Sequence, residues 1–491
     1  MDRDVNEDQR SPLAHDETGW GLWDAISLIV GIVIGTSIFR APPLVFQNVS
    51  SAWGSLALWL VGGGVSLMGA WCYAELSTAF RQRGGDYHYL TLAYGPLVGF
   101  LFGWAQLTII LTASMGTMAF TFADYATRLA PSWSQHSAWL ALASLVVLAL
   151  LNLSNVQMGR HTQNVLTTAK VLGLTSVLLA GVLASNTGTI QSAANTITPP
   201  SAPLWSRLGL ALIFVLYAYG GWNDAAMVAS EVRAPERNMP RALCGGIIAI
   251  TAIYFLMNVV YLRVLGLERA GAATTPAADV LAVGFASFGW SQWAERGICV
   301  LVMISALGAL NGLLLTGSRL FAAWGADWPG FRWLAMTGDG HPTTTRSMTA
   351  QTVVTAALIL LVGTDSGRSL IDSGVRLAHL PALQWDRFQG GFDLLLASAA
   401  PAFWLFFTMT VVAVVVLRRR HPDQPRPFRV PAYPAPVILF SAACLYMLYS
   451  AVDYAGSLSL MSLLPLGTGL IYGLLRFKRP AGATWRTRIP R

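Results

Sequence analysis

Gly31-Ile32-Val33-Ile34-Gly35-Thr36-Ser37-Ile38-Phe39 is the stretch that decides the fold, because it places a break inside an apolar run from about Leu22 to Phe46. A second apolar run, from about Leu204 to Ala229, is broken at Tyr219-Gly220-Gly221-Trp222. A helix in lipid must satisfy its own backbone hydrogen-bonding groups, so a break at membrane depth needs protein, water or ligand around it. Paired broken helices in the two halves of a chain are typical of secondary transporters and mark the substrate site.

The composition excludes an ordinary soluble protein. The chain has 491 residues, of which 54% are hydrophobic and 11% are charged. A soluble protein carries about 25% charged residues, so this chain has too little charge to cover a water-facing surface. The net charge of +8 does not indicate a nucleic-acid partner, because the basic residues are spread over alternate loops.

The apolar runs predict an all-α membrane protein. A helix that crosses the bilayer needs about 17–25 mostly apolar residues, and about twelve segments meet this condition. Residues 1–19 lack the pattern of a cleaved signal peptide and are interpreted as a cytosolic tail. The predicted spans lie near residues 22–46, 53–79, 96–127, 137–157, 164–185, 204–230, 243–266, 293–323, 347–363, 393–417, 434–454 and 457–475.

The distribution of basic residues predicts the orientation. Most Arg and Lys residues fall in the two tails and in every second loop, including Arg418, Arg419 and Arg420 after the tenth run. Short loops rich in Arg and Lys stay on the cytoplasmic side. We therefore expect a multi-pass protein of the cell membrane with both termini in the cytoplasm, the second as a basic tail at residues 477–491.

The runs fall into two comparable groups, at about residues 22–185 and 204–417, and each group begins with its broken helix. Because each group has an odd number of spans, the second enters the membrane from the opposite side. The sequence therefore predicts a transport core at residues 20–420, built as a 5+5 inverted repeat, and two further helices at residues 432–476. The connection at residues 364–392 has two interpretations, an amphipathic helix on the outer face or an irregular loop.

Five stretches occur in a consistent order over roughly residues 20–475: residues 31–39, 73–76 with 83–87, 214–241, 310–319 and 426–431. They resemble amino-acid permeases of the amino acid–polyamine–organocation superfamily, above all its L-type amino acid transporter branch. The resemblance implies a leucine-transporter-like fold with helices 1 and 6 broken, and an amino acid as the substrate.

An amino acid in a water-poor cavity needs donors for its carboxylate and acceptors for its ammonium group. At the first break, the N–H groups of a half-helix beginning near Thr36 would point at an anion, assisted by the helix dipole. At the second break, free carbonyls near Tyr217 and Tyr219 would accept from the ammonium. The alternative for the glycines is close packing of helices through small residues. The predicted substrate-binding residues are Gly35, Thr36, Ser37, Ile38, Tyr217, Tyr219, Gly220, Gly221, Trp222, Asn223 and Asp224.

Three of these positions have a more specific interpretation. The family usually has glycine where this chain has Ser37, so the serine either narrows the carboxylate pocket or adds a donor. Tyr217 aligns with a gating aromatic of similar transporters, which would close over the substrate and exclude water; simple packing is the alternative. Asn223 either satisfies loose backbone groups or contacts the substrate.

Lys170 lies inside the fifth apolar run, where an ionisable group is costly and usually functional. In similar permeases without sodium dependence, a lysine here occupies the place of a sodium ion between the first and eighth helices. We expect Lys170 to couple transport by linking the first break to Ser305 or Asn311, and proton exchange at its amine is a second role. The alternative is a lysine that extends to the inner interface.

Two charged residues follow the breaks, Arg40 after the first and Asp224 after the second. They are predicted to form an ion pair that gates the external side together with Tyr217, or a purely structural pair. Alternatively, Asp224 binds a cationic group of the substrate. Glu75, Glu231 and Arg319 are expected in polar networks near the inner ends of their helices.

These patterns predict a secondary active transporter that moves amino acids by alternating access, independent of sodium, as a proton-coupled carrier or an exchanger. The alternative is a polyamine or cationic amino-acid antiporter, in which Asp224 binds the additional charge. The sequence contains neither a Walker loop nor an arrangement of enzyme residues, so we expect no cofactor and no enzyme activity. The expected partners are an amino acid, the lipid bilayer and protons.

Cysteine usage bears on metals and on protein partners. The four cysteines lie in apolar runs, without metal-ligand spacing and without a position for a loop disulfide. In eukaryotic L-type chains, a cysteine in the third external-side connection binds a glycoprotein, and residues 130–137 contain none. We therefore expect no metal, no disulfide-linked glycoprotein subunit, and a bacterial-type permease of the inner membrane that acts alone.

Overall fold

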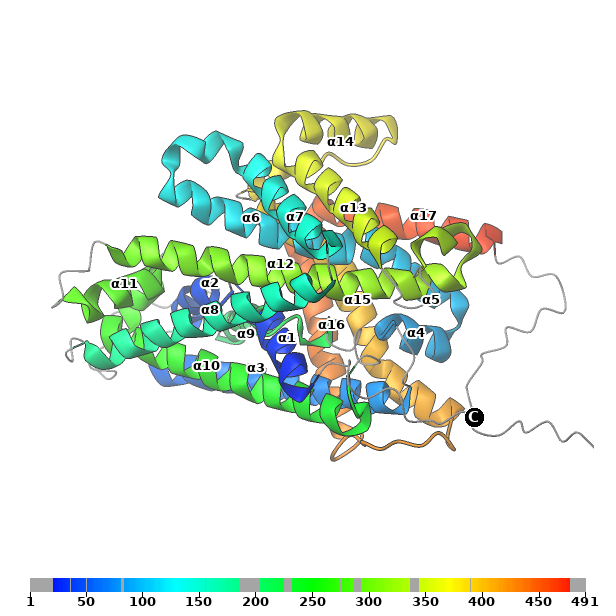
Figure 1. Cartoon of the computed structure of the whole chain (residues 1–491), viewed down its shortest axis with the longest axis horizontal. Helices are drawn as coiled ribbons and strands as arrows, with labels where there is room; N and C mark the ends of the chain where they lie inside the picture. The colour runs from blue at the N-terminus through cyan, green and yellow to red at the C-terminus, as the bar shows by residue number, and fades with distance from the viewer. Residues whose placement is uncertain are drawn as a thin grey trace, which may run out of the picture.

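The computed structural model describes residues 21–35, 37–49, 51–80, 84–154, 156–184, 204–224, 232–273, 275–286, 293–335, 344–388 and 390–476. The described residues are almost entirely helical (Figure 1). This confirms the all-α fold that the sequence predicts.

The helices follow one another with short connections. A π-helical turn, Gln106–Ile110, joins α5 to α6 without interrupting the run. The α-helices are α1 (Leu22–Val33), α2 (Ser37–Val49), α3 (Ala52–Ala79), α4 (Asp86–Tyr94), α5 (Pro96–Ala105), α6 (Leu111–Leu129), α7 (Ser137–Ser154), α8 (Val156–Leu183), α9 (Leu204–Ala218), α10 (Pro235–Ala272), α11 (Pro276–Gly284), α12 (Ala294–Asp327), α13 (Thr345–Gly363), α14 (Asp365–Leu377), α15 (Gly391–Arg420), α16 (Ala435–Ala455) and α17 (Leu460–Arg476).

Within the described residues, nine helices are long and apolar enough to cross a membrane, and the bent pair α1 and α2 makes a tenth. The two helices of this pair differ in direction by 52° at the first break. The expected total of about twelve spans remains a prediction. One reason is that α9 has only 15 residues, and another is that α16 and α17 follow each other in one helical run, Ala435–Arg476.

Backbone hydrogen bonds explain where the first helix stops. The N–H of Ile34 still donates to the carbonyl of Val30, as in a regular helix, over 2.9 Å. The N–H of Gly35 instead donates to the carbonyl of Val33, two residues back, over 2.6 Å. This tight turn ends the helical hydrogen-bond pattern, so α2 begins independently at Ser37.

The second break is a pair of turns after Ala218. The N–H of Gly220 donates to the carbonyl of Tyr217 over 3.1 Å, and the N–H of Asp224 donates to that of Gly221 over 3.2 Å. Gly221 has φ 106°, a conformation that glycine adopts without strain. A Cβ atom on Gly221 would lie 2.9 Å from Cγ2 of Ile32, so glycine also allows the two breaks to approach each other.

Helices at matching places in the two groups pack against each other. α2 contacts α9, α3 contacts α10, α6 contacts α12, and α7 contacts α13. In an inverted repeat a symmetry axis relates helices at matching places, and these four contacts are compatible with that arrangement. The boundaries of the transport core at residues 20–420 and of the added helices at 432–476 remain predictions.

The connection at residues 364–392 contains the helix α14, so Asp365–Leu377 is a helix and not an irregular loop. Its predicted place on the outer face of the membrane stays a prediction. Thr364 caps this helix, because its hydroxyl accepts from the N–H of Gly367 over 3.1 Å. Along α14 only Val375 is buried, whereas Leu370 and Leu377 are exposed. Figure 1 shows α14 at the periphery of the bundle.

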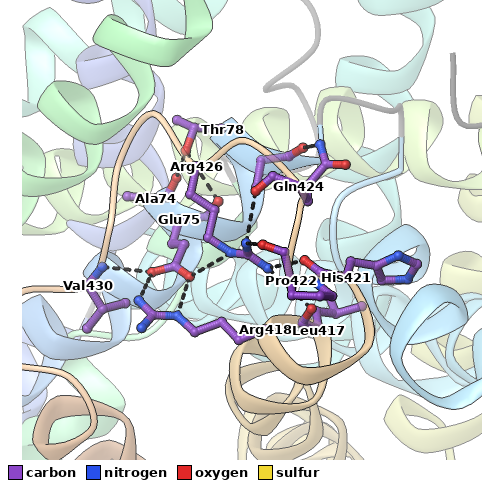
Figure 2. A network of polar contacts seen from close by, with 11 residues as sticks. Ala74, Glu75, Thr78, Leu417, Arg418, His421, Pro422, Gln424, Arg426 and Val430 are labelled. Carbon is purple, nitrogen blue, oxygen red and sulfur yellow. Dashed lines mark hydrogen bonds and ion pairs between the residues drawn. The ribbon is translucent and has the colours of Figure 1, made fainter. Parts of the chain in front are cut away.

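Glu75, near the end of α3, is the centre of a polar network that joins α3 to the end of α15 (Figure 2). Arg418 donates to both carboxylate oxygens, over 2.7 and 2.5 Å, and the N–H of Val430 donates to Oε2 over 2.7 Å. Arg426 lies 3.6 Å from the same carboxylate. The expected network role of Glu75 is therefore confirmed, whereas Glu231 lies outside the described residues.

Candidate functional site

A cavity of about 170 Å³ lies between the two breaks. Both breaks, α6, α12 and α15 contribute to its wall. Seven of the predicted substrate-binding residues line it: Gly35, Ser37, Tyr217, Gly220, Gly221, Asn223 and Asp224. The other lining residues are Ile32, Val33, Ser114, Thr117, Met118, Leu216, Ala309, Leu313, Leu395, Leu396, Ala399, Ala400, Phe403 and Trp404.

Of the four residues predicted at the first break, two line the cavity. Thr36 lies outside the described residues. Ile38 is fully buried and is not among the lining residues, so it packs behind the cavity. Gly35 and Ser37 flank the break and line the cavity, which places the start of α2 beside the enclosed space.

Two aromatic residues of the second break, Tyr219 and Trp222, are not among the lining residues, and their part in substrate binding stays a prediction. The hydroxyl of Tyr219 donates to the carbonyl of Trp59 over 3.0 Å, and its ring packs against Trp59 and Tyr254. The ring of Trp222 packs edge-on against Tyr73, with centroids 5.2 Å apart. Both rings therefore pack against neighbouring helices and do not line the cavity.

Tyr254 of α10 is a residue that the sequence analysis missed. Its hydroxyl lies 3.0 Å from the carbonyl of Val33 at the first break and 3.0 Å from that of Ala218 at the second. One fully buried hydroxyl therefore holds both interrupted helices together. The available signal was a tyrosine inside an apolar run, where a hydroxyl needs a hydrogen-bonding partner.

Lys170 of α8 is fully buried, which rules out a side chain that extends to the membrane interface. Its amine donates to the carbonyl of Gly31 over 2.6 Å. Ser305 of α12 donates to the carbonyls of Ile34 and Gly35 over 3.0 and 3.1 Å. Lys170 and Ser305 thus bind carbonyls at the end of α1 and within the first break, and the coupling role of Lys170 stays a prediction.

Asn311, the other candidate on α12, belongs to a separate cluster. Its side-chain oxygen accepts from Asn152 of α7 over 2.7 Å, and its amide donates to Gln163 of α8 over 3.0 Å. This cluster connects three helices behind the first break.

Arg40 has a different partner from the one expected. Its guanidinium lies 3.7 Å from the carboxylate of Asp124 on α6 and 4.9 Å from the ring centre of Phe392. The described residues thus pair Arg40 with Asp124 and not with Asp224, and the gating role of Arg40, Asp224 and Tyr217 stays a prediction. Arg40 lies on α2, and its ion-pair partner Asp124 lies on α6.

Among the described residues, Asp224 is the only charged one that lines the cavity. Its carboxylate accepts from the amide of Asn223 over 3.1 Å. Within the described residues, no Lys or Arg side chain forms an ion pair with it. The cavity wall otherwise consists of apolar groups, glycines, Ser37, Ser114, Thr117, Asn223 and the hydroxyl-bearing Tyr217.

Ser114 and Thr117 were missed by the sequence analysis. Both lie on α6, one and two turns after the π-helical segment Gln106–Ile110. Their hydroxyls donate to carbonyls of their own helix, at Ile110 and Ala113. The lone pairs of both oxygens remain available to a ligand. A π-turn inside a long helix frequently occurs at a functional site, but it cannot be recognised in a single sequence.

In the part of the chain that the structure describes, no three His, Cys, Asp or Glu side chains lie together as a metal site. The described lining residues offer peptide groups, hydroxyls, one amide and one carboxylate, and Lys170 is not among them. Such groups are of the kinds that can contact both an anionic and a cationic group of one small molecule.

Comparison with known proteins identifies the family of the chain. Residues 21–471 match the family described as "Amino acid permease". The chain is 28% identical to the b(0,+)-type amino acid transporter 1 of Mus musculus over 96% of its own length and 90% of that protein. It is 30% identical to the cystine/glutamate transporter of Homo sapiens, over 86% and 78% of the two chains. It is 29% identical to the large neutral amino acids transporter small subunit 2 of Rattus norvegicus, over 86% of its own length and 74% of that protein.

Proposed function

Because the chain belongs to the amino acid permease family, we propose that it moves amino acids by alternating access, independently of sodium, as an exchanger or a proton-coupled carrier. It is a multi-pass membrane protein, and its relatives are transporters, not enzymes. The match confirms the family resemblance of the five motifs. The observation that carries the proposal is the cavity that Gly35 and Ser37 of one break share with Gly220 and Gly221 of the other.

In this proposal, the two ends of the amino acid bind to different breaks. The substrate carboxylate accepts hydrogen bonds at the start of α2, where free N–H groups and the helix dipole favour an anion. The ammonium group donates to carbonyls at the end of α9 near Tyr217. The apolar wall formed by α15, with Phe403 and Trp404, receives the substrate side chain.

Lys170 takes the place that a sodium ion would otherwise fill in the proposed mechanism. Its amine binds the carbonyl of Gly31 just before the first break. A side chain attached to α8 remains there throughout the transport cycle, so the broken helix is held without a dissociable ion. This role supports sodium-independent transport.

A second candidate is transport of cationic amino acids or polyamines, and Asp224 favours it. A buried carboxylate that has no cationic partner is energetically costly. A positively charged group on the substrate would relieve this cost inside the cavity. Arginine and lysine would then bind more tightly than neutral amino acids of similar size.

Counterflow in proteoliposomes tests both candidates. Vesicles that contain the full-length protein are loaded with unlabelled amino acid, and entry of labelled leucine, arginine or putrescine is measured in sodium or choline buffer, with and without a pH gradient. We expect exchange of at least one amino acid at equal rates in sodium and choline. Uptake that requires sodium would contradict the role of Lys170. Exchange of putrescine alone would favour the polyamine antiporter.

We further propose that the chain acts without a disulfide-linked subunit, in a bacterial inner membrane, with both termini in the cytoplasm. Cys72, Cys299 and Cys444 are buried, and Cys244 is partly buried on α10. The burial of three of the four thiols supports this proposal. A single band at the same position on reducing and non-reducing gels supports this proposal, and a shift on reduction contradicts it.

A further inference from the structure

Arg40 of α2 and Asp124 of α6 form a loose ion pair. Their nearest atoms, Nη2 and Oδ2, lie 3.7 Å apart, whereas a charge-assisted hydrogen bond measures about 2.7–2.9 Å. About a third of each side chain is exposed, 32% and 37%. In the described part of the chain, the guanidinium of Arg40 forms no hydrogen bond. A partly exposed pair of this length contributes little to stability, so both charges are available to a ligand.

Two aromatic rings hold the guanidinium of Arg40 in place. It lies 4.9 Å from the ring centre of Phe392 on α15 and 5.8 Å from that of Tyr125 on α6. Both rings are buried, and a cation within about 6 Å of an aromatic ring is attracted to its face. These contacts fix the charge without using its N–H donors, which are the groups that bind a carboxylate.

The Arg40 cluster, defined as Arg40, Asp124 and Phe392, lies along the helices from the cavity. Each member shares a helix with a cavity-lining residue at a spacing of three or seven positions: Arg40 after Ser37, Asp124 after Thr117, and Phe392 before Leu395. Such spacings keep side chains on one face of a helix, one or two turns apart. The cluster therefore lies one to two turns beyond the cavity wall.

The Arg40 cluster and the Glu75 network lie at opposite ends of α15. Phe392 is in the first turn of this helix, whereas Arg418, which binds Glu75, is in its last turn. Arg418 donates to both carboxylate oxygens of Glu75, so that end is held by hydrogen bonds that the pair of Arg40 and Asp124 lacks. With the predicted orientation, the Arg40 cluster faces the outside, and an incoming substrate reaches it before the cavity.

We propose that Arg40 and Asp124 form an outer subsite that binds an amino acid as a zwitterion before it enters the cavity. This inference rests on the proposed function and deepens it, because it names the charge state that the entrance selects. The substrate carboxylate accepts hydrogen bonds from Arg40, and the substrate ammonium group donates to Asp124. Both charges of an α-amino acid are attached to one carbon, so they lie close enough together to meet both members of a pair 3.7 Å apart. Each charge of the protein exchanges one opposite partner for another, and neither is left unpaired.

Exchange kinetics of the full-length protein in proteoliposomes test the subsite. Labelled leucine is the probe, and labelled arginine replaces it if counterflow shows no entry of leucine. We expect KM to rise about fivefold in Arg40→Gln and in Asp124→Asn, as the loss of one partly exposed charge contact predicts, with kcat unchanged within about twofold. In the double variant, KM should rise by the product, roughly 25-fold, because the zwitterion loses both contacts.

The double variant separates the subsite from an ion pair that is only structural or only a gate. If the two side chains acted only on each other, either single variant would already break the pair, and the double variant would be no worse. Arg40→Lys keeps the positive charge but loses the fork of donors, so its KM should lie between those of the wild type and Arg40→Gln. This variant also serves if Arg40→Gln does not fold.

Arg296→Gln is the matched control. Arg296 also lies over an aromatic ring, 5.0 Å from the centre of Trp293. It is exposed near the start of α12, well before the lining residue Ala309 of that helix. Its loss should leave both KM and kcat at the values of the wild type.

Four results would overturn the subsite and leave amino-acid transport intact. They are unchanged KM values in the single variants, a double variant no worse than either single one, a fall in kcat with KM unchanged, and an equal rise of KM in the control. If the wild type exchanges no amino acid, the subsite and the proposed function both fail.

Discussion

At the scale of single residues, one amine and two hydroxyls, those of Ser305 and Tyr254, bind the carbonyls around the first break. Lys170 binds Gly31, and Ser305 binds Ile34 and Gly35. The sequence allowed Lys170 to be chosen because a lysine is rare in an apolar run. It did not separate Ser305 from Asn311, because both lie on the same helix and only the packing of α1 against α12 decides which one meets the break.

Replacement of Lys170 by alanine should abolish most transport. It leaves the carbonyl of Gly31 without a partner in a buried place, which destabilises the protein by about 1.5–3 kcal/mol. Counterflow and thermal unfolding measure the two effects. Val171→Ala, at a partly exposed neighbour on α8, is the control and should behave like the wild type. Transport by Lys170→Ala at the wild-type rate would refute the coupling role.

At the scale of helices, close packing of α1 against α8 depends on Gly31. A Cβ atom there would lie 2.4 Å from Nε2 of Gln163 and 2.7 Å from Oγ1 of Thr167. Gly31→Ala should therefore destabilise the protein by about 1–3 kcal/mol, as overpacking does, and lower its melting temperature in detergent. Gly64→Ala on α3 is the matched control, because no atom lies within 4 Å of its Cβ position. A lower melting temperature in the control alone would contradict the packing argument.

The Glu75 network joins two helices that are far apart in the sequence. Glu75→Gln removes the charge that binds Arg418 and Arg426, so stability should fall by about 1.5–3 kcal/mol. Thermal unfolding at low and high salt measures the loss. Asp423→Asn changes an exposed carboxylate in the same loop and should have no measurable effect. Equal melting temperatures for both variants would show that the network does not stabilise the bundle.

At the scale of the whole molecule, the pairing of α2 with α9, α3 with α10, α6 with α12 and α7 with α13 builds the cavity from both groups of helices. Rocking of one part against the other would then expose the cavity to alternate sides. This arrangement requires an even number of spans if both termini lie on one side.

Reporter fusions test that orientation. A fluorescent protein that folds only in the cytoplasm should be fluorescent at either terminus, because the basic loops and tails are held inside. Alkaline phosphatase, which is active only outside, should be inactive at both ends and active in the connection that contains α14. Phosphatase activity at either terminus would refute the predicted orientation.

The sequence by itself determined the class of the protein, the place of both breaks and the family, because these depend on local properties. Apolar length decides what can cross lipid, and a glycine such as Gly221 permits a turn that other residues resist. Only the tertiary structure decided which side chains meet across the breaks. Tyr254 binds both interrupted helices, Arg40 pairs with Asp124, and Tyr219 and Trp222 turn away from the cavity. These contacts join segments distant in sequence, so they follow from how the helices pack and from no local pattern.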